Sequence, residues 1–442
     1  MISLGLTVIC VALFITSDKF VRYIIYTLSA LYPFSMGDLG PIPAAQVVEW
    51  LTPLYLLIII NEMVPLNRIV AAKPLPSFRG TELFLTALLF LLVCAAMSFY
   101  KNELMAIDGG PQGTKRVYFR IIVSVFIFIT TALSTYVYKD IINFEKLFKT
   151  ILWVSVGLGI IRLACYFVSF KMPLMTGPFV YNPDATTRFG GTAYRIGGLT
   201  EVVGVGLGAS VALYMLMRKI DYRALAAFSI FLFMSGGRTI MVGSLFSVGL
   251  FFLLFLNKKL IYLILILFLC VIIMVIVIPP EVFQGQVNRF LAMQGGMATQ
   301  DHERYQSYMI HFNNFRENIF FGKGIVQYTG FLYHVNPKME EFIRANLLSG
   351  GHGSYISILG TFGLFGTLYL FIMVYGGILV SYLKTKKYSV DNVILAAISS
   401  FTFIYLTIKS VYYVSSHSGI NDLSLFYLVG FVSSIILIEK NR

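Results

Sequence analysis

Long apolar runs recur along most of the chain, and they constrain its fold more than any other feature. Each holds about 20 mostly uncharged residues, the length that a helix needs to cross the hydrocarbon core of a bilayer. The runs are continuous and do not alternate between polar and apolar residues, so they predict helices and not the strands of a barrel. The sequence therefore predicts an all-α, polytopic integral membrane protein with about 12–14 transmembrane helices. The predicted spans are 2–17, 20–35, 44–61, 81–100, 117–138, 150–170, 199–217, 222–237, 238–256, 260–279, 354–383, 390–413 and 420–438.

The composition supports a membrane protein over a soluble one. Of the 442 residues, 57% are hydrophobic and only 12% are charged, and a soluble domain cannot hide that much apolar surface. The net charge of +13 would suggest a nucleic-acid partner in a soluble protein. Here, basic residues that anchor the spans at the cytoplasmic leaflet explain part of it, and the sequence predicts no nucleic-acid partner.

Short basic clusters give the orientation of the spans. They lie at 139–149, 218–223, 258–259, 384–387 and 440–442, and they alternate so that they share one side of the membrane. Lys and Arg in short loops mark the cytoplasm, so the remaining loops and the N-terminus are predicted outside. The longest outer loop, 280–353, contains the amphipathic segment 305–315 and is predicted to form a helical cap. This loop divides the chain into helices 1–279, the cap, and helices 354–442.

The unusual polar residues gather on the predicted outer side. All five histidines lie there, and so do the charged residues inside the spans, which occupy the outer halves of their helices. Charges in a membrane usually line a cavity, although helix-end Lys and Arg also extend to the interface. Extension to the interface accounts for Arg120 and Lys409 better than for Arg162 and Arg238. The histidines are His302, His311, His334, His352 and His417, and the charged residues are Arg120, Arg162, Arg195, Glu201, Arg238 and Lys409.

Three outer helix starts share a glycine pair beside a basic or imidazole side chain, at 195–198, 236–239 and 350–354. A helix N-terminus presents free N–H groups and the positive end of its dipole, and glycine lets an anion approach the backbone. Three such starts around one vestibule, with arginines added, suit a pyrophosphate. The alternative is that each glycine pair only makes a tight turn between spans.

His352 is the most informative of the histidines. It lies on a glycine-rich turn directly before a long span, where a nearby helix dipole and arginines would keep the imidazole neutral. A neutral imidazole at this boundary can act as the general base for a hydroxyl, or it can serve only as a hydrogen-bonding group. A metal site is not expected, because His302, Glu303 and His311 lack a ligand spacing.

Three motifs in this order resemble a known family. In chain order they are Ser235-Gly236-Gly237-Arg238 at a span start; Arg304-Tyr305 followed by Gly322-Lys323-Gly324; and the segment 352–366, which begins at His352 and ends in Gly363-x-x-Gly366. The chain resembles the O-antigen ligase/polymerase superfamily of bacterial membrane glycosyltransferases, which includes Wzy-type polymerases and O-antigen ligases. Tyr194-Arg195-Ile196-Gly197-Gly198 is a fourth, shorter match. The chain departs from the family pattern at Gly353, where Asn is usual, at Gly360-Thr361, where Glu is frequent, and before Phe320, where a Pro is missing.

The resemblance implies a chemistry and a set of roles. The donor would be an undecaprenyl-pyrophosphate-linked glycan, used without a metal or another cofactor by a GT-C-like glycosyltransferase. Arg238 and Arg304 would hold the pyrophosphate, and His352 would take the proton of the acceptor hydroxyl. Further substrate-binding candidates are Arg162, Arg188, Arg195, Arg289, Tyr305 and Tyr308. The implied location is the bacterial inner membrane with a periplasmic active face, and a chain-length regulator and a flippase would be further partners.

Three functions fit this resemblance and topology to different degrees. The first is a polymerase that transfers a growing polysaccharide to the next lipid-linked repeat unit. The second is a ligase that transfers the polysaccharide to lipid A-core. The third is a flippase for lipid-linked oligosaccharides, which is disfavoured because its charges would be expected through the full membrane depth.

Overall fold

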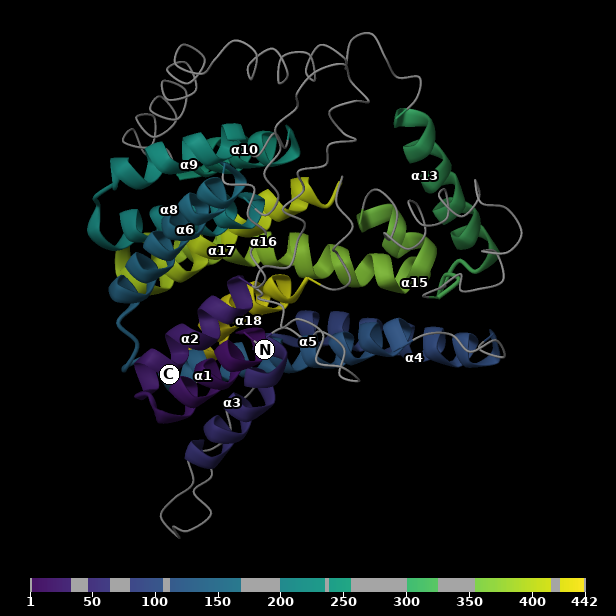
Figure 1. The fold of residues 1–442 in the computed structure, drawn as a ribbon, viewed down its shortest axis with the longest axis horizontal. Coiled ribbons are helices and arrows are strands. Elements are labelled where there is room, and N and C mark those ends of the chain that lie inside the picture. The colour runs from purple at the N-terminus through teal and green to yellow at the C-terminus, as the bar shows by residue number, and fades with distance from the viewer. Residues whose placement is uncertain are drawn as a thin grey trace. The chain divides into compact units, whose positions relative to one another are not determined.

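The computed structural model describes residues 2–32, 47–63, 80–105, 112–167, 199–234, 238–255, 300–324, 354–414 and 422–440. Within these ranges the ordered elements are helices, and no strand is present (Figure 1). The chain forms two compact units, each assembled from separate stretches of sequence. Unit 1 comprises 1–37, 138–297 and 378–411, and unit 2 comprises 38–137, 298–377 and 412–442.

Unit 1 is a helical bundle in which aromatic rings pack on glycines. Its main contact joins α6 to α8, and Phe148 of α6 also packs on Phe401 of α17 with ring centroids 5.4 Å apart. The helices are α1 (Ile2–Thr16), α2 (Lys19–Leu31), α6 (Phe144–Phe167), α8 (Leu199–Met217), α9 (Tyr222–Met234), α10 (Arg238–Phe255), α16 (Gly377–Asp391) and α17 (Val393–Tyr412).

Unit 2 packs α18 on α5, and α15 on both α4 and α13. Gly430 lets α18 approach α5 closely, because a Cβ there would lie 2.6 Å from the Phe128 carbonyl oxygen. The helices are α3 (Val47–Met63), α4 (Glu82–Met105), α5 (Gln112–Val137), α13 (Gln300–Glu317), α15 (Ser354–Phe371), the π-helical turn η4 (Ile372–Gly376) and α18 (Leu423–Lys440).

Asparagine and aspartate begin several of these helices. The side-chain oxygen of Asn143 accepts a hydrogen bond from the Lys146 N–H at 2.9 Å, and that of Asn392 accepts one from the Leu395 N–H at 3.1 Å. Such caps satisfy N–H groups that have no partner inside the helix. They start α6 and α17 at the ends that the basic clusters predict to be cytoplasmic.

Six helical runs of the described residues are long and apolar enough to cross a membrane. They are 82–100, 118–137, 144–164, 354–391, 393–412 and 423–440. The predicted all-α polytopic fold is confirmed, and helices occupy every predicted span except 260–279, which lies outside the described residues. In α17 and α18, 89% of the span residues are buried inside the protein, whereas in α4 the share is 39%.

Candidate active site

The helical run that follows His352 is folded back on itself at Gly363. Gly363 has φ 64° and ψ −151°, a backbone conformation that is essentially restricted to glycine. The Tyr355 hydroxyl donates to the Tyr375 hydroxyl at 3.1 Å, although residues twenty apart on a straight helix are separated by about 30 Å. Residues 354–362 therefore form a first leg that packs against a second leg. The sequence predicts one continuous span over 354–383, and that expectation is wrong.

Residues 318–324 close this hairpin through their backbone. The N–H groups of Leu364 and Phe365 donate to the carbonyls of Ile319 and Phe320, at 2.8 and 3.2 Å. In return, the N–H groups of Lys323 and Gly324 donate to the carbonyls of residues 360 and 361, at 3.0 and 2.8 Å. A break in an apolar helix frees backbone groups that lipid cannot satisfy, and this clamp pairs those groups with protein.

Glycine is required at three points of the clamp. A Cβ on Gly363 would lie 2.6 Å from backbone atoms of Ile319, Phe320 and Gly322. A Cβ on Gly360 would lie 2.7 Å from the carbonyl oxygen of His311, and one on Gly322 would lie 2.5 Å from the backbone of Thr361. The predicted motifs 322–324 and 360–366 are thus the two halves of one interlocked element.

α13 crosses the first leg of α15 and runs in the same direction (Figure 1). His311 contacts Gly360, and farther along both segments the Ile319 carbonyl accepts a hydrogen bond from the Leu364 N–H. The residue numbers of the two segments therefore rise in the same direction. Arg304 precedes His311 by seven residues, which is about two helical turns and returns to the same side of α13. The start of α15 lies six residues before Gly360. Arg304 and Ser354 consequently occupy corresponding places toward the starts of the two elements.

Within unit 2, the start of α15 is fixed to Tyr413 and, through it, to the residues that begin α18. The Ser354 N–H donates to the Tyr413 carbonyl at 2.8 Å, and the Tyr413 hydroxyl donates to Asp422 at 2.7 Å. Asp422 also accepts from the Ser424 hydroxyl at 2.6 Å, at the first turn of α18. Ser354 is the first described residue of this segment, and His352 lies outside the described residues.

His311 is buried in the contact between α13 and α15. It is only 7% exposed, and neither ring nitrogen has a hydrogen-bond partner in the described part of the chain. Burial lowers the pKa of His311 below its usual value, because the charged imidazolium would lose its hydration. The imidazole is therefore neutral and packs between α13 and α15.

A family model for the O-antigen ligase matches residues 223–371. This match confirms the predicted resemblance to the O-antigen ligase/polymerase superfamily over that part of the chain. No curated protein matches the chain. The matched region contains α13, the clamp segment 318–324 and α15, together with Arg238, Arg304 and His352.

The predicted site residues fall into two groups, those that the structure describes and those that lie outside the described residues. Arg238 is the first residue of α10, and Arg304 and Tyr305 lie in the first turns of α13, where the structure describes the backbone. Tyr308, one turn before His311, is half-buried. Arg162 lies near the end of α6. His352, Arg188, Arg195 and Arg289 lie outside the described residues.

Arg162 belongs to a polar cluster inside unit 1. It interacts electrostatically with Glu201 in the first turn of α8 and with Tyr32 at the end of α2. The Tyr32 hydroxyl is in turn hydrogen-bonded to the Ser155 hydroxyl of α6. These contacts tie α2, α6 and α8 together in the halves of the helices that are predicted to lie near the outer surface.

Two further charges are held inside the protein, and the expectation that they extend to the interface is wrong. The Arg120 Nε donates to Glu49 at 2.7 Å, and the Glu49 side chain is 2% exposed. Lys409 is 5% exposed, with its ammonium 4.9 Å from the centre of the Tyr405 ring. A carboxylate and an aromatic face, respectively, stabilise these cations away from water.

The clamp is a structural feature that the sequence analysis did not predict. The signal was present as the regular spacing Gly360-x-x-Gly363-x-x-Gly366 together with Gly322-x-Gly324. Among the described residues, no group of His, Cys, Asp or Glu side chains could hold a metal ion.

Proposed function

We propose that the chain polymerises undecaprenyl-pyrophosphate-linked oligosaccharide repeat units into O-antigen or a related surface polysaccharide. The match of residues 223–371 to the O-antigen ligase family model supports transfer of a lipid-linked glycan as the class of reaction. The proposed location is the bacterial inner membrane, with the reaction on its periplasmic face. The lipid-linked glycan and the bilayer are the proposed partners, with a chain-length regulator and a flippase acting beside the enzyme.

The observation that carries the proposal is the parallel course of α13 and the first leg of α15. The contact of His311 with Gly360 sets the register, and it brings the position of Arg304 toward the same end as Ser354. His352 is two residues from Ser354. A cation and a general base from distant parts of the sequence would then serve one reaction centre.

The proposed step forms one glycosidic bond and breaks one bond to pyrophosphate. The acceptor hydroxyl attacks the anomeric carbon of the donor glycan while the imidazole of His352 takes the hydroxyl proton. The bond from the anomeric carbon to the pyrophosphate oxygen breaks, and undecaprenyl pyrophosphate leaves with the electron pair. Arg304 and Arg238 stabilise the charge that develops on this leaving group.

The remaining predicted residues would bind the substrate around that centre. Arg188, Arg195 and Arg289 would guide the donor or the acceptor, and Tyr305 and Tyr308 would stack on sugar rings. Arg162 would contribute positive charge from α6, although its interaction with Glu201 favours a share in holding α6 to α8.

Substitution at the three proposed catalytic positions tests the mechanism. Arg304→Ala, Arg238→Ala and His352→Ala should each abolish glycan assembly in a complemented deletion strain while the protein still inserts in the membrane. Arg316→Ala, at the exposed end of α13, is the matched control for Arg304→Ala and should assemble glycan normally. Normal assembly by any one of the three variants would remove that residue from the mechanism.

Ligase activity is the second candidate function, because the matching family model is described as that of an O-antigen ligase. The glycolipids of a deletion strain separate the two. A polymerase deletion leaves lipid A-core that carries a single repeat unit. A ligase deletion instead accumulates polymer on undecaprenyl pyrophosphate and leaves lipid A-core bare, and that pattern would replace the polymerase proposal.

A further inference from the structure

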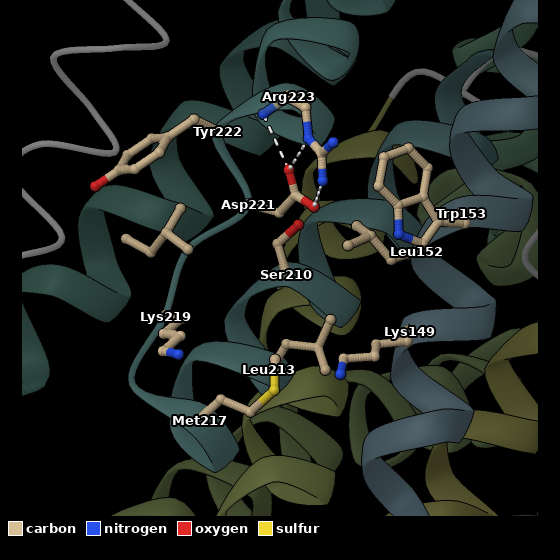
Figure 2. Close-up of a pocket in the computed structure, with 11 residues that line it drawn as sticks. Lys149, Leu152, Trp153, Ser210, Leu213, Met217, Lys219, Asp221, Tyr222 and Arg223 are labelled. Carbon is tan, nitrogen blue, oxygen red and sulfur yellow. Dashed lines mark hydrogen bonds and ion pairs between the residues drawn. The ribbon is translucent and has the colours of Figure 1, made fainter.

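A basic hollow opens at the end of unit 1 that carries the connection from α8 to α9 (Figure 2). Its volume is about 490 Å³. α6 contributes Lys149, Leu152 and Trp153 from one face, and α8 contributes Ser210, Leu213 and Met217 from one face. The connection adds Lys219, Ile220 and Asp221, and α9 adds Tyr222 and Arg223. None of these residues belongs to the proposed reaction centre.

The lining has an excess of positive charge, with three cations and one carboxylate. Asp221 serves as the N-cap of α9, since its carboxylate accepts from the N–H groups of Arg223 and Ala224 at 3.1 and 3.4 Å. Its ion pair with Arg223 is long, at 3.4 Å, and the Arg223 side chain is 82% exposed. Such a pair contributes little, so the guanidinium keeps its capacity for another anion.

The two lysines differ in their existing contacts. Lys149 pairs with Glu145 one turn earlier on α6, in an exposed contact that a stronger anion can displace. Lys219 has no ion-pair partner among the described residues, and its ammonium lies beside the hollow (Figure 2). Arg218, the residue directly after α8, has φ 56°, and this left-handed conformation turns the chain toward Lys219 at the start of the connection to α9.

The lower wall and the rim are apolar and aromatic. Leu152, Leu213 and Met217 form the wall. Trp153 is 44% exposed beneath the Arg223 guanidinium, which lies 5.5 Å from the ring, and Tyr222 is 55% exposed. A second hollow shares Lys149 and Trp153, and Ile160 continues the exposed face of α6 two turns farther along the helix. Cations above an apolar, aromatic surface are the arrangement found at a membrane–water interface.

We propose that this hollow binds the headgroup phosphate of an anionic phospholipid. Lys219, Arg223 and Lys149 hold the phosphate oxygens, and the acyl chains follow Trp153 and Ile160 along the lipid-facing side of α6. The hollow lies at helix ends that the basic clusters predict to be cytoplasmic, where anionic lipids attract basic residues. A free phosphate would use the same cations but would gain nothing from the apolar wall. The inference is independent of the proposed glycan transfer.

Native mass spectrometry of the full-length protein in detergent tests the site. The probes are phosphatidylglycerol, phosphatidylcholine and inorganic phosphate, each added alone. Phosphatidylglycerol should bind and raise the melting temperature, whereas phosphatidylcholine and inorganic phosphate should do neither. Lys219→Gln and Arg223→Gln should each weaken phosphatidylglycerol binding about fivefold, because a basic residue near an anionic surface contributes about that factor.

Lys386→Gln is the matched control, because Lys386 is an exposed lysine of unit 1 on α16 and does not line the hollow. It should bind phosphatidylglycerol as the unaltered protein does. An equal loss in Lys386→Gln would overturn the site in favour of general surface charge. Equal protection by inorganic phosphate would overturn the lipid in favour of a soluble anion. Equal binding of phosphatidylcholine, whose phosphate is balanced by a choline cation, would overturn the requirement for an anionic lipid.

Discussion

Two glycines of unit 1 and two glycines of the hairpin in unit 2 meet different neighbours. In unit 1 they receive the ends of aromatic side chains: Cβ atoms on Gly204 and Gly206 would meet the rings of Tyr405 and Phe228 at 2.8 and 2.1 Å. In unit 2, Gly360 and Gly363 receive backbone atoms of α13 and of the segment that follows it. A ring can turn or shift, but a hydrogen-bonded backbone cannot. The packing of unit 1 can therefore adjust, whereas the hairpin of unit 2 holds one geometry.

This difference indicates where the protein needs accuracy. The proposed reaction centre depends on the register between α13 and the first leg of α15, and that register is fixed by backbone against backbone. The bundle of unit 1 needs closely packed side chains around Gly204 and Gly206, but not one fixed register between two backbone segments. Substitutions at matched glycines can separate the two requirements, as can a change of pH.

The largest effect is expected from Gly363→Ala. Alanine would be strained at φ 64° and ψ −151° by about 1–3 kcal/mol, and its Cβ would also clash with three backbone atoms. The hairpin should open and glycan assembly should fall by at least about tenfold, measured on gels from complemented cells. Gly376→Ala is the control in the same helical run, since its Cβ would meet only ordinary contacts at 3.6 Å or more. Normal assembly by Gly363→Ala would contradict the role of the clamp.

Gly360→Ala should have the next largest effect. Its Cβ would lie within 2.8 Å of three His311 atoms, so α13 must move away from the first leg at a cost of about 1–3 kcal/mol. Glycan assembly should fall, and trypsin should cleave after Arg316 and Lys323 faster than in the unaltered protein. Unchanged cleavage and unchanged assembly together would show that the α13 contact tolerates displacement.

Gly206→Ala should affect stability more than activity. The Phe228 ring must shift, and overpacking of this kind costs about 1–3 kcal/mol. The melting temperature should fall while glycan assembly persists. Gly157→Ala, in unit 1 with no atom within 4 Å of the new Cβ, should leave the melting temperature unchanged or raise it. If Gly206→Ala abolished assembly in a stable protein, the contrast between the units would fail.

The smallest effect concerns pH. The pKa of His311 is lowered in the docked state, so the undocked state binds the proton more readily below about pH 6.5. Docking of α13 is therefore stabilised at neutral pH, and that stability is lost as the pH falls through this region. Trypsin cleavage after Arg316, corrected for the enzyme's own pH response, should accelerate at pH 5.5. His311→Leu should remove the dependence, and its persistence would assign the effect to another group.

The sequence predicted the membrane spans well because their length and hydropathy are local properties. The spans at 199–217 and 238–256 agree with α8 and α10 to within one residue. The reversal at Gly363 escaped prediction because hydropathy records how apolar a run is but not whether it turns. Gly363-x-x-Gly366 was noted as a motif and Gly360 as a departure from the family pattern, yet the role of both glycines depends on α13 and residues 318–324, which are far away in sequence.

The buried charges show the same limit. Arg120 and Lys409 have the positions of interfacial residues in sequence, but the fold brings Glu49 of α3 to Arg120 and buries Lys409 beside the ring of Tyr405, one turn earlier on α17. Likewise, the sequence placed His311 on the outer side, but nothing local distinguishes a buried imidazole from a reactive one. Packing against other helices decided the burial of Lys409 and His311, and an ion pair with another helix decided the place of Arg120.

The clamp also has a consequence for how the protein is made. Residues 318–324 leave the ribosome before α15 does, so the acceptors and donors for the broken helix are already present when residues 360–365 arrive. A straight 354–391 helix would insert readily on its own. The mature hairpin needs its partner segment delivered first, so biogenesis constrains the order of these two motifs along the chain. A single residue inserted between 320 and 323 would shift the two sets of clamp hydrogen bonds, at 319–320 and at 323–324, relative to each other.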